Sequence, residues 1–435
     1  MNKLILKGLL VLVSFSVSGQ QHIWTIQECL ETGLKNSFDV KIKQLAMTQA
    51  KKSHYPFLLS LSPSISVTGS HSYDFGSTID PSTNARVSSD FQYDNIYLNA
   101  RVNLLNFENI AQSAKGKVDI ELAKADKEVV EYTYKMQLLE NYFEVVYTQE
   151  LLKIQEEQMV NTQFNVDRIG KEVSIGKKPK SDWYDIQLSH AQEQKQLLET
   201  RQLYHLQKLQ LFQLMNIEEN TENLIFAVSI EGEIDLHGTY KDLAVENPRL
   251  LLAELNYQNS LKNVAVQRAS KMPLLTGYYT LSSFYTNELN SNIIKENFED
   301  QINANKSSSA GLQLNIPIFN GFRNSKNIAV SKIESEKSKE ALEQAKNSIN
   351  QQLREESTKK MQYQQLQEIL QTTLHYAEES FKTTQHKFES DKIDAVTFTS
   401  VKNQLLASKY DVLKNNLLVQ YTALKIKLLK INRLE

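Results

Sequence analysis

Four segments of the chain alternate between apolar and polar residues. In the segment 96–104 the even positions are apolar, whereas the odd positions carry Tyr, Asn, Arg and Asn. The segments 61–75 and 310–318 alternate in a similar way, and the segment 275–285 is aromatic and less regular. Period two places successive side chains on opposite faces of a strand. The pattern therefore predicts four strands, each with one apolar face and one polar face.

A single alternating strand is typical of a soluble sandwich, but four of them set among very long helices are not. The two predicted loops, Gly76 to Asp94 and Thr286 to Ser308, are long and rich in Ser, Asn and Asp. Long polar loops of this kind are typical of the outer side of membrane barrels.

The rest of the chain predicts long helices. There is no proline between Pro81 and Pro179, and neither Gly nor Pro occurs after Gly321. Stretches without these breakers that are rich in Gln, Lys, Glu and Leu favour helix. A helix from Glu108 to about Gly170 would be roughly 90 Å long. Apolar stripes follow it and its counterpart in the second half: Leu138, Tyr142, Val145 and Leu152, and then Leu366, Leu370, Leu374, Ala377 and Phe381.

The chain also repeats itself at about half its length. The string 103–107 (NLLNF) corresponds to 315–319 (NIPIF), and Gly176 corresponds to Asp391. Each copy is predicted to contain a helix, two strands, and a hairpin of two long helices. The predicted organisation is a signal peptide at 1–19, a first repeat at 20–217, a connecting equatorial segment at 218–240 and a second repeat at 241–435.

The N-terminus predicts export. Lys3 and Lys7 precede an apolar stretch from Gly8 to Val17, which is followed by Ser18 and Gly19. This order of positive, apolar and small residues is typical of a secretory signal peptide. A buried N-terminal helix is the alternative interpretation.

Composition excludes several classes of function. A net charge of -2 gives no basic surface for nucleic acid. The single Cys29 cannot form an intrachain disulfide, and the eight His show no metal-ligand spacing. With no phosphate loop or nucleophile motif either, the sequence predicts a protein that is not an enzyme and holds no cofactor or metal.

Membrane insertion would have to use the strands, because no later segment has eighteen consecutive apolar residues. Four strands cannot close a barrel, and an open strand edge in lipid is not tolerated. Several copies would therefore share one barrel. Two copies would give eight strands and an interior filled by side chains, whereas three would give twelve. A conduit favours three or more copies.

Three motifs, in this order, resemble those of the TolC-like outer-membrane efflux family. The first is the opening helix 24–30 (WTIQECL) with Asn36, repeated as Glu246-Asn247-Pro248 in the second half. The second is 316–321 (IPIFNG) at the end of the last strand. The third is 173–176 (VSIG) followed by Asp182 at a helix-hairpin tip. The resemblance covers nearly the whole mature chain, although Ser37 replaces the Pro that usually follows Asn36.

This resemblance implies a mainly α fold with a membrane β-barrel part. The expected assembly is a homotrimer with four strands per subunit, which form a shared 12-stranded barrel, and long helices, which form a periplasmic α-barrel. The segment 216–238 would lie in an equatorial belt, with short strands at 224–230 and 231–236. The chain would be an outer-membrane exit duct extending into the periplasm, in a tripartite efflux or type I secretion system. Its partners would be outer-membrane lipid, a periplasmic adaptor and an inner-membrane pump of the RND or ABC type.

The resemblance also implies site residues. An acidic ring at the periplasmic gate would be formed by Asp182 and Asp185, because the matching positions of the second copy are Thr397 and Ser400. Acids that cap a solvated helix N-terminus are the alternative interpretation of this pair. The adaptor-docking tips and the residues facing the barrel lumen complete the set: Gly176, Lys177, Lys178, Asp391 and Lys392 at the tips, and Arg101, Asn103, Gln313 and Asn315 in the lumen.

Two alternatives stay open at this point. Arg101 could be a girdle charge near a membrane interface instead of a lumen residue. The whole chain could also be an elongated periplasmic coiled-coil protein without a channel.

Overall fold

The computed structural model describes residues 23–79, 84–218, 225–227, 246–289 and 296–432. The predicted signal peptide and most of the connecting segment 218–240 lie outside these residues. The chain divides into two compact units. One unit contains the residues 39–130 and 241–351, and the other contains 1–38, 131–240 and 352–435. We call them the sheet unit and the hairpin unit. No helix within the described ranges has an apolar stretch long enough to cross a membrane.

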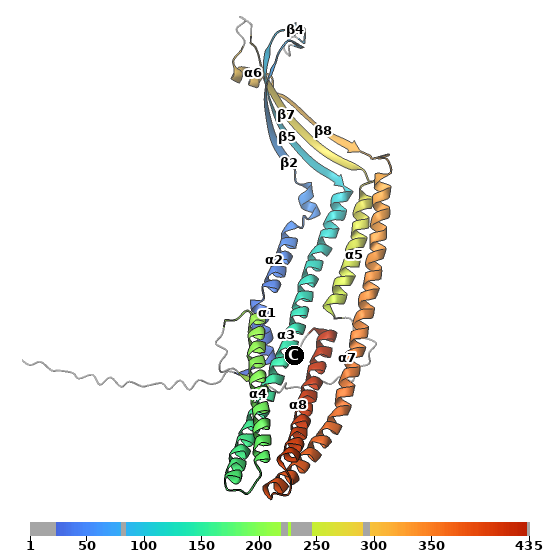
Figure 1. Ribbon diagram of the computed structural model, residues 1–435. Helices are drawn as coiled ribbons and strands as arrows, with labels where there is room; N and C mark the ends of the chain where they lie inside the picture. Colours follow the sequence, from blue (N-terminus) through green and yellow to red (C-terminus); the bar gives the residue numbers. More distant parts are fainter. Residues whose placement is uncertain (1–22, 80–83, 219–224, 228–245, 290–295, 433–435) are drawn as a thin grey trace, which may run out of the picture. The chain divides into compact units, whose positions relative to one another are not determined.

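The sheet unit is organised around four antiparallel strands (Figure 1). Their order is β2 (Ser64–Asp74), β5 (Phe91–Asn106), β7 (Leu274–Glu288) and β8 (Ser307–Asn315). Among the described strands, β2 and β8 are therefore paired on one side only. The four predicted strands are confirmed, and their register brings the alternating faces into line across the sheet.

The two predicted loops are more structured than expected. β5 begins at Phe91 and β7 continues to Glu288, so both strands extend into the segments predicted as loops. A small hairpin of β3 (Ser77–Ile79) and β4 (Arg86–Ser88) follows β2, and the short helix α6 (Phe298–Ala304) precedes β8. The carboxamide of Gln301 in α6 bonds the backbone N–H and carbonyl of Thr286, at 3.0 and 3.1 Å. The composition of these segments is that of a polar coil, because side-chain hydrogen bonds to a nearby backbone, like those of Gln301, require no alternation of apolar residues.

Helices of the sheet unit are joined to one another by polar contacts. α2 (Phe38–Ser53) leads through a 3₁₀ turn, η1 (Phe57–Leu61), to β2. Lys43 of α2 pairs with Asp126 of α3 (Phe107–Ser174) at 2.6 Å. α5 (Pro248–Ala269) is capped by Asn247 and has Pro248 at its first position, a combination that favours the start of a helix. Its Asn259 donates to Asp119 of α3.

The hairpin unit contains two pairs of helices. α3 turns into α4 (Lys180–Met215), and α7 (Arg323–Glu389) turns into α8 (Ala395–Ile431), as Figure 1 shows. α3 has 68 residues and α7 has 67, which confirms the predicted long helices. The α3 stripe is confirmed too, because Leu138, Tyr142 and Val145 are at most 1% exposed. The α7 stripe is only partly buried, since Leu366 is 44% exposed.

A small parallel ladder packs on the helices of the hairpin unit. β1 (Ile23–Trp24) pairs with β6 (Ile225–Phe226), and α1 (Ile26–Asn36) follows β1 with a complete capping box on Thr25. The carboxamide of Gln149 bonds the backbone N–H and carbonyl of Phe226 at 2.8 and 3.0 Å. β6 covers two of the three described residues of the strand predicted at 224–230, and the second strand, predicted at 231–236, lies outside the described residues.

Candidate functional site

Both helix hairpins of the hairpin unit turn with the same backbone motif. Gly176 and Asp391 have positive φ, at 75° and 57°. In each turn the next residue donates its N–H five residues back, Lys177 to Glu172 at 2.8 Å and Lys392 to Lys387 at 2.9 Å. These bonds complete a Schellman motif, which needs a left-handed residue at its centre. The predicted correspondence of Gly176 and Asp391 is therefore confirmed, and Asp is one of the few residue types that tolerate this conformation.

Helix α3 continues to Ser174, past the end that the sequence predicted near Gly170. A Cβ at Gly170 would lie 3.1 Å from the indole nitrogen of Trp183, so this glycine allows α4 to approach α3 closely. Helix propensity alone could not distinguish this packing role from a turn, because glycine is unfavourable in a helix and common in turns.

A buried apolar cluster joins the two hairpins beside these turns, and we call it the tip cluster. Its centre is the stacked pair Phe388 and Phe398, whose ring centroids are 4.4 Å apart with 11° between planes. Both rings are at most 2% exposed. The cluster consists of residues from α3, α4, α7 and α8: Val166, Ile169, Ile186, Phe388, Ala395 and Phe398. Side chains of the two hairpins therefore share one core at this end.

Charged groups surround the tip cluster. The ammonium group of Lys178 lies 2.9 Å from Asp391, 3.7 Å from Asp182 and 4.6 Å from the centroid of Phe388. Only 4% of the Lys178 side chain is exposed. Lys177 adds a second bond to Asp391 at 3.2 Å. The hydrogen bonds from Lys178 and Lys177 lower the pKa of Asp391, and the bond to Asp391 raises the pKa of Lys177. We call this ion-pair group, which links the two turns, the tip latch.

The structure brings four of the seven predicted gate and docking residues into this latch: Asp182, Lys177, Lys178 and Asp391. Asp182 is 8% exposed, and Asp185 on the next turn of α4 is half-buried. Gly176 and Lys392 are both exposed at the turns. The gate and docking roles stay predictions. Asp394 is the N-cap of α8 and accepts the N–H of Thr397 at 2.8 Å.

The sequence interpretation missed Phe398 and Arg168. The guanidinium of Arg168 lies 5.2 Å from the centroid of Phe388, on the same ring that Lys178 contacts. Phe388 and Phe398 lie on either side of the α7–α8 turn, and two aromatic residues in these positions could have indicated a buried cluster beside it.

The four predicted lumen residues share one face of the sheet. Across the strands, Asn103 is opposite Thr276, which is opposite Gln313. Arg101 lies two residues before Asn103 and Asn315 lies two residues after Gln313, so both point to the same side. The face also carries Asn99, which accepts the Thr280 hydroxyl at 3.1 Å.

The opposite face of the sheet is apolar and exposed. Ile65 and Val67 on β2 are 66% and 69% exposed, and Leu312 and Leu314 on β8 are 69% and 60% exposed. Exposed apolar side chains side by side on a sheet mark a surface that another apolar phase or molecule covers. Their position therefore requires a partner for this face.

Comparisons with known proteins agree with this arrangement. Residues 239–429 match the family described as outer membrane efflux protein. No curated protein sequence matches the chain. Its fold is similar to that of CusC, with a TM-score of 0.78, 14% identity, and coverage of 93% of this chain and 91% of CusC.

Two further solved outer-membrane proteins have a similar fold. VceC from Vibrio cholerae gives a TM-score of 0.75 at 13% identity, with coverage of 94% of this chain and 95% of VceC. The open state of MtrE from Neisseria gonorrhoeae gives 0.73 at 13% identity, with coverage of 94% and 90%. Residues 239–429 therefore match the outer membrane efflux family, and the chain as a whole has the fold of these solved outer-membrane proteins.

Proposed function

We propose that the chain is a TolC-like exit duct of the outer membrane that extends into the periplasm. It would assemble as a homotrimer and pass substrates passively, without a catalytic step, through a tip that opens like an iris. The observation that carries this proposal is the sheet of the sheet unit. Its edge strands β2 and β8 are paired on one side only among the described strands, and its apolar face is exposed.

The two edges support a sheet that continues into other copies. In a bilayer every backbone polar group needs a partner within the protein, so β2 of one subunit would pair with β8 of the next. Three copies give twelve strands, which leaves an open interior, whereas two give eight and a filled one. The apolar face would then contact lipid, and the polar face with Arg101, Asn103, Gln313 and Asn315 would line the lumen.

Exposed apolar stripes on the helices support the same assembly. On α4, Tyr184 and Leu188 are 61% and 59% exposed, and on α7, Ile369 and Tyr376 are 61% and 67% exposed. These pairs are four and seven residues apart, so each lies on one side of its helix. Packing against helices of neighbouring subunits in a periplasmic α-barrel would bury them.

The tip latch and tip cluster would hold the closed state within each subunit. Opening would separate the two hairpins, break the Lys178–Asp391 pair and release Asp182 and Asp185 toward the pore axis, where three copies would form an acidic ring. Such a ring would favour cations.

A periplasmic adaptor would dock at the turns through Gly176, Lys177, Lys178, Asp391 and Lys392, and an inner-membrane pump of the RND or ABC type would supply the substrate. In the closed conformation Lys178 is buried, so its contribution to docking would follow opening.

Single-channel recording in planar bilayers tests the gate. The wild-type protein is compared with Asp182→Asn/Asp185→Asn, and Glu199→Gln serves as a control because it removes an exposed acid from the same helix. The proposal predicts discrete, cation-selective openings that lose selectivity only in the double variant. Unchanged selectivity in the double variant would place the gate elsewhere, and the absence of any openings would contradict the duct.

A further inference from the structure

A buried lysine connects α8 to the first hairpin above the tip cluster. Lys402 is 1% exposed, and its ammonium group donates to the Glu193 carboxylate and to the hydroxyls of Ser189 and Thr162, the latter two at 3.0 and 3.4 Å. The Thr162 hydroxyl donates to the other carboxylate oxygen of Glu193 at 2.6 Å. An ammonium group has three N–H donors, so this set uses all of them.

The position of the pair is distinctive. Lys402 lies seven residues after the first residue of α8, which places it about 10 Å along the helix axis from that end. Its acceptors come from two other helices, Thr162 from α3 and both Ser189 and Glu193 from α4. One ammonium group therefore fixes α8 against both helices of the first hairpin.

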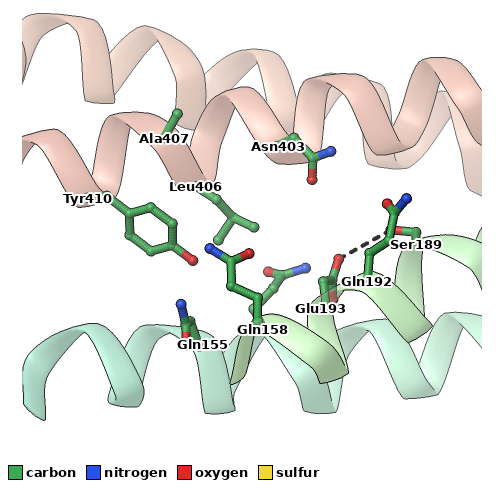
Figure 2. A pocket seen from close by; sticks show the side chains of 10 residues that line it. Gln155, Gln158, Ser189, Gln192, Glu193, Asn403, Leu406, Ala407 and Tyr410 are labelled. Carbon is green, nitrogen blue, oxygen red and sulfur yellow. Dashed lines mark hydrogen bonds between the residues drawn. The ribbon is translucent and has the colours of Figure 1, made fainter. Parts of the chain in front are cut away.

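A polar cavity adjoins this network (Figure 2). It has a volume of about 220 Å³, and Ser189 and Glu193 form part of its wall. Most of the remaining lining consists of carboxamides: Gln155, Gln158, Gln192, Gln196 and Asn403. Gln155 is 6% exposed, and its carboxamide interacts with the Tyr410 hydroxyl of α8. A polar cavity of this size can hold several water molecules.

Charge and apolar contacts respond differently when helices slide. Moving α8 by one residue would shift Lys402 by about 1.5 Å and rotate it by about 100°, which would take its ammonium group away from all three acceptors. Leucine contacts such as those of Leu405 and Leu406 tolerate such a change better, because apolar packing has no directional requirement. A buried polar group in a helical bundle can therefore specify one register.

We propose that the Lys402–Glu193 pair is a register pin, which holds α8 in one position against α3 and α4 while the hairpin ends on the tip side of it separate. The carboxamide-lined cavity extends from the pin on the side away from the turns, so it lies outside the part that separates. This inference rests on the proposed opening at the tip, and it assigns the fixed point of that movement.

Four variants test the pin in planar bilayers. Lys402→Met and Glu193→Gln each remove one member, and Lys402→Met/Glu193→Gln removes both charges. Arg201→Met is the matched control, because Arg201 also joins α4 to α3 through an ion pair, with Glu156 at 2.8 Å, but is exposed. The pin predicts that each single variant and the double variant raise the open probability by at least about tenfold. The control should match the wild type.

Thermal unfolding separates the pin from a purely stabilising role. Each single variant leaves a buried polar group without its partner, whereas the double variant does not, so the double variant should unfold at a higher temperature than either single one. A double variant that is stable but still leaky supports the pin. A double variant that closes as tightly as the wild type, or leakage that simply follows loss of stability, would overturn it.

Hydrogen–deuterium exchange of detergent-solubilised protein tests the same claim without conduction. Residues 395–410 should exchange slowly in the wild type and faster in the double variant, while Arg201→Met leaves them unchanged. Unaltered exchange in the double variant would overturn the pin. If exchange changes as expected but no protein conducts, the pin stands and the proposed duct fails.

Discussion

Phe388→Ala is the most informative change at the tip. Phe388 is fully buried, stacks on Phe398 and has the cationic groups of Lys178 and Arg168 over its ring. Removing a buried Phe side chain in a packed core costs about 3–5 kcal/mol. Only part of this free energy favours the closed state over the open one, because the stack with Phe398 lies within the α7–α8 hairpin and persists when the hairpins separate.

The part that acts on closure is the packing of Phe388 against the first hairpin. Burying a Phe side chain contributes about 1.5–3 kcal/mol, and we assign about 2 kcal/mol to the interface that opening breaks, which includes Val166, Ile169 and Ile186. Since 1.4 kcal/mol is a factor of ten, the closed-to-open ratio should fall about 30-fold.

Open probability at fixed voltage in planar bilayers measures this ratio. Phe388→Leu keeps most of the volume and should shift the ratio by less than about tenfold. Phe164→Ala removes an aromatic ring of α3 that is 69% exposed in the subunit and should leave the tip cluster intact. If Phe388→Ala folds and assembles but opens no more often than the wild type, the tip cluster does not hold the closed state.

Three other predictions concern the ladder, the latch and the lumen. Gln149→Leu removes both backbone bonds of β6 and should destabilise the protein by about 1–3 kcal/mol in thermal unfolding, and an unchanged melting temperature would contradict this role. The tip latch should stay closed from about pH 5 to 9. Because the pKa of Asp391 is lowered, its ion pairs stabilise the latch until the pH falls below the ordinary value of 3.8. Because the pKa of Lys177 is raised, its ion pair stabilises the latch until the pH rises above the ordinary value of 10.5. Opening that titrates near neutral pH would disprove that assignment. Arg101→Glu should shift the reversal potential toward cations if Arg101 faces the lumen, and no shift would favour the girdle position.

The alternation of β5 predicted its two faces, because period two depends only on local sequence. Breaker-free composition predicted α3 and α7 for the same reason. The correspondence of the turn residues Gly176 and Asp391 followed from the repeat, whereas their Schellman hydrogen bonds came from the structure.

Contacts between distant segments were not predictable. Lys178 and Asp391 lie in different hairpins, and so do Glu193 and Lys402, and no periodicity within one helix indicates which residue of another helix it meets. The exposure of Leu366 was not predictable either. An apolar position on a helix indicates that the side chain is covered, but it does not indicate whether the same subunit or another one covers it. The pairing of Asp182 with Lys178 is local, at i and i+4, but Lys178 lies before Pro179, the N-cap of α4, so helix spacing did not indicate it.

Electron cryomicroscopy of the detergent-solubilised protein is the most direct test of the duct. We expect three copies around one axis, with β2 of each subunit paired to β8 of the next and a continuous lumen lined by the polar face of the sheet. A particle with another number of copies, or one in which β2 and β8 stay unpaired and no lumen runs along the axis, would contradict it.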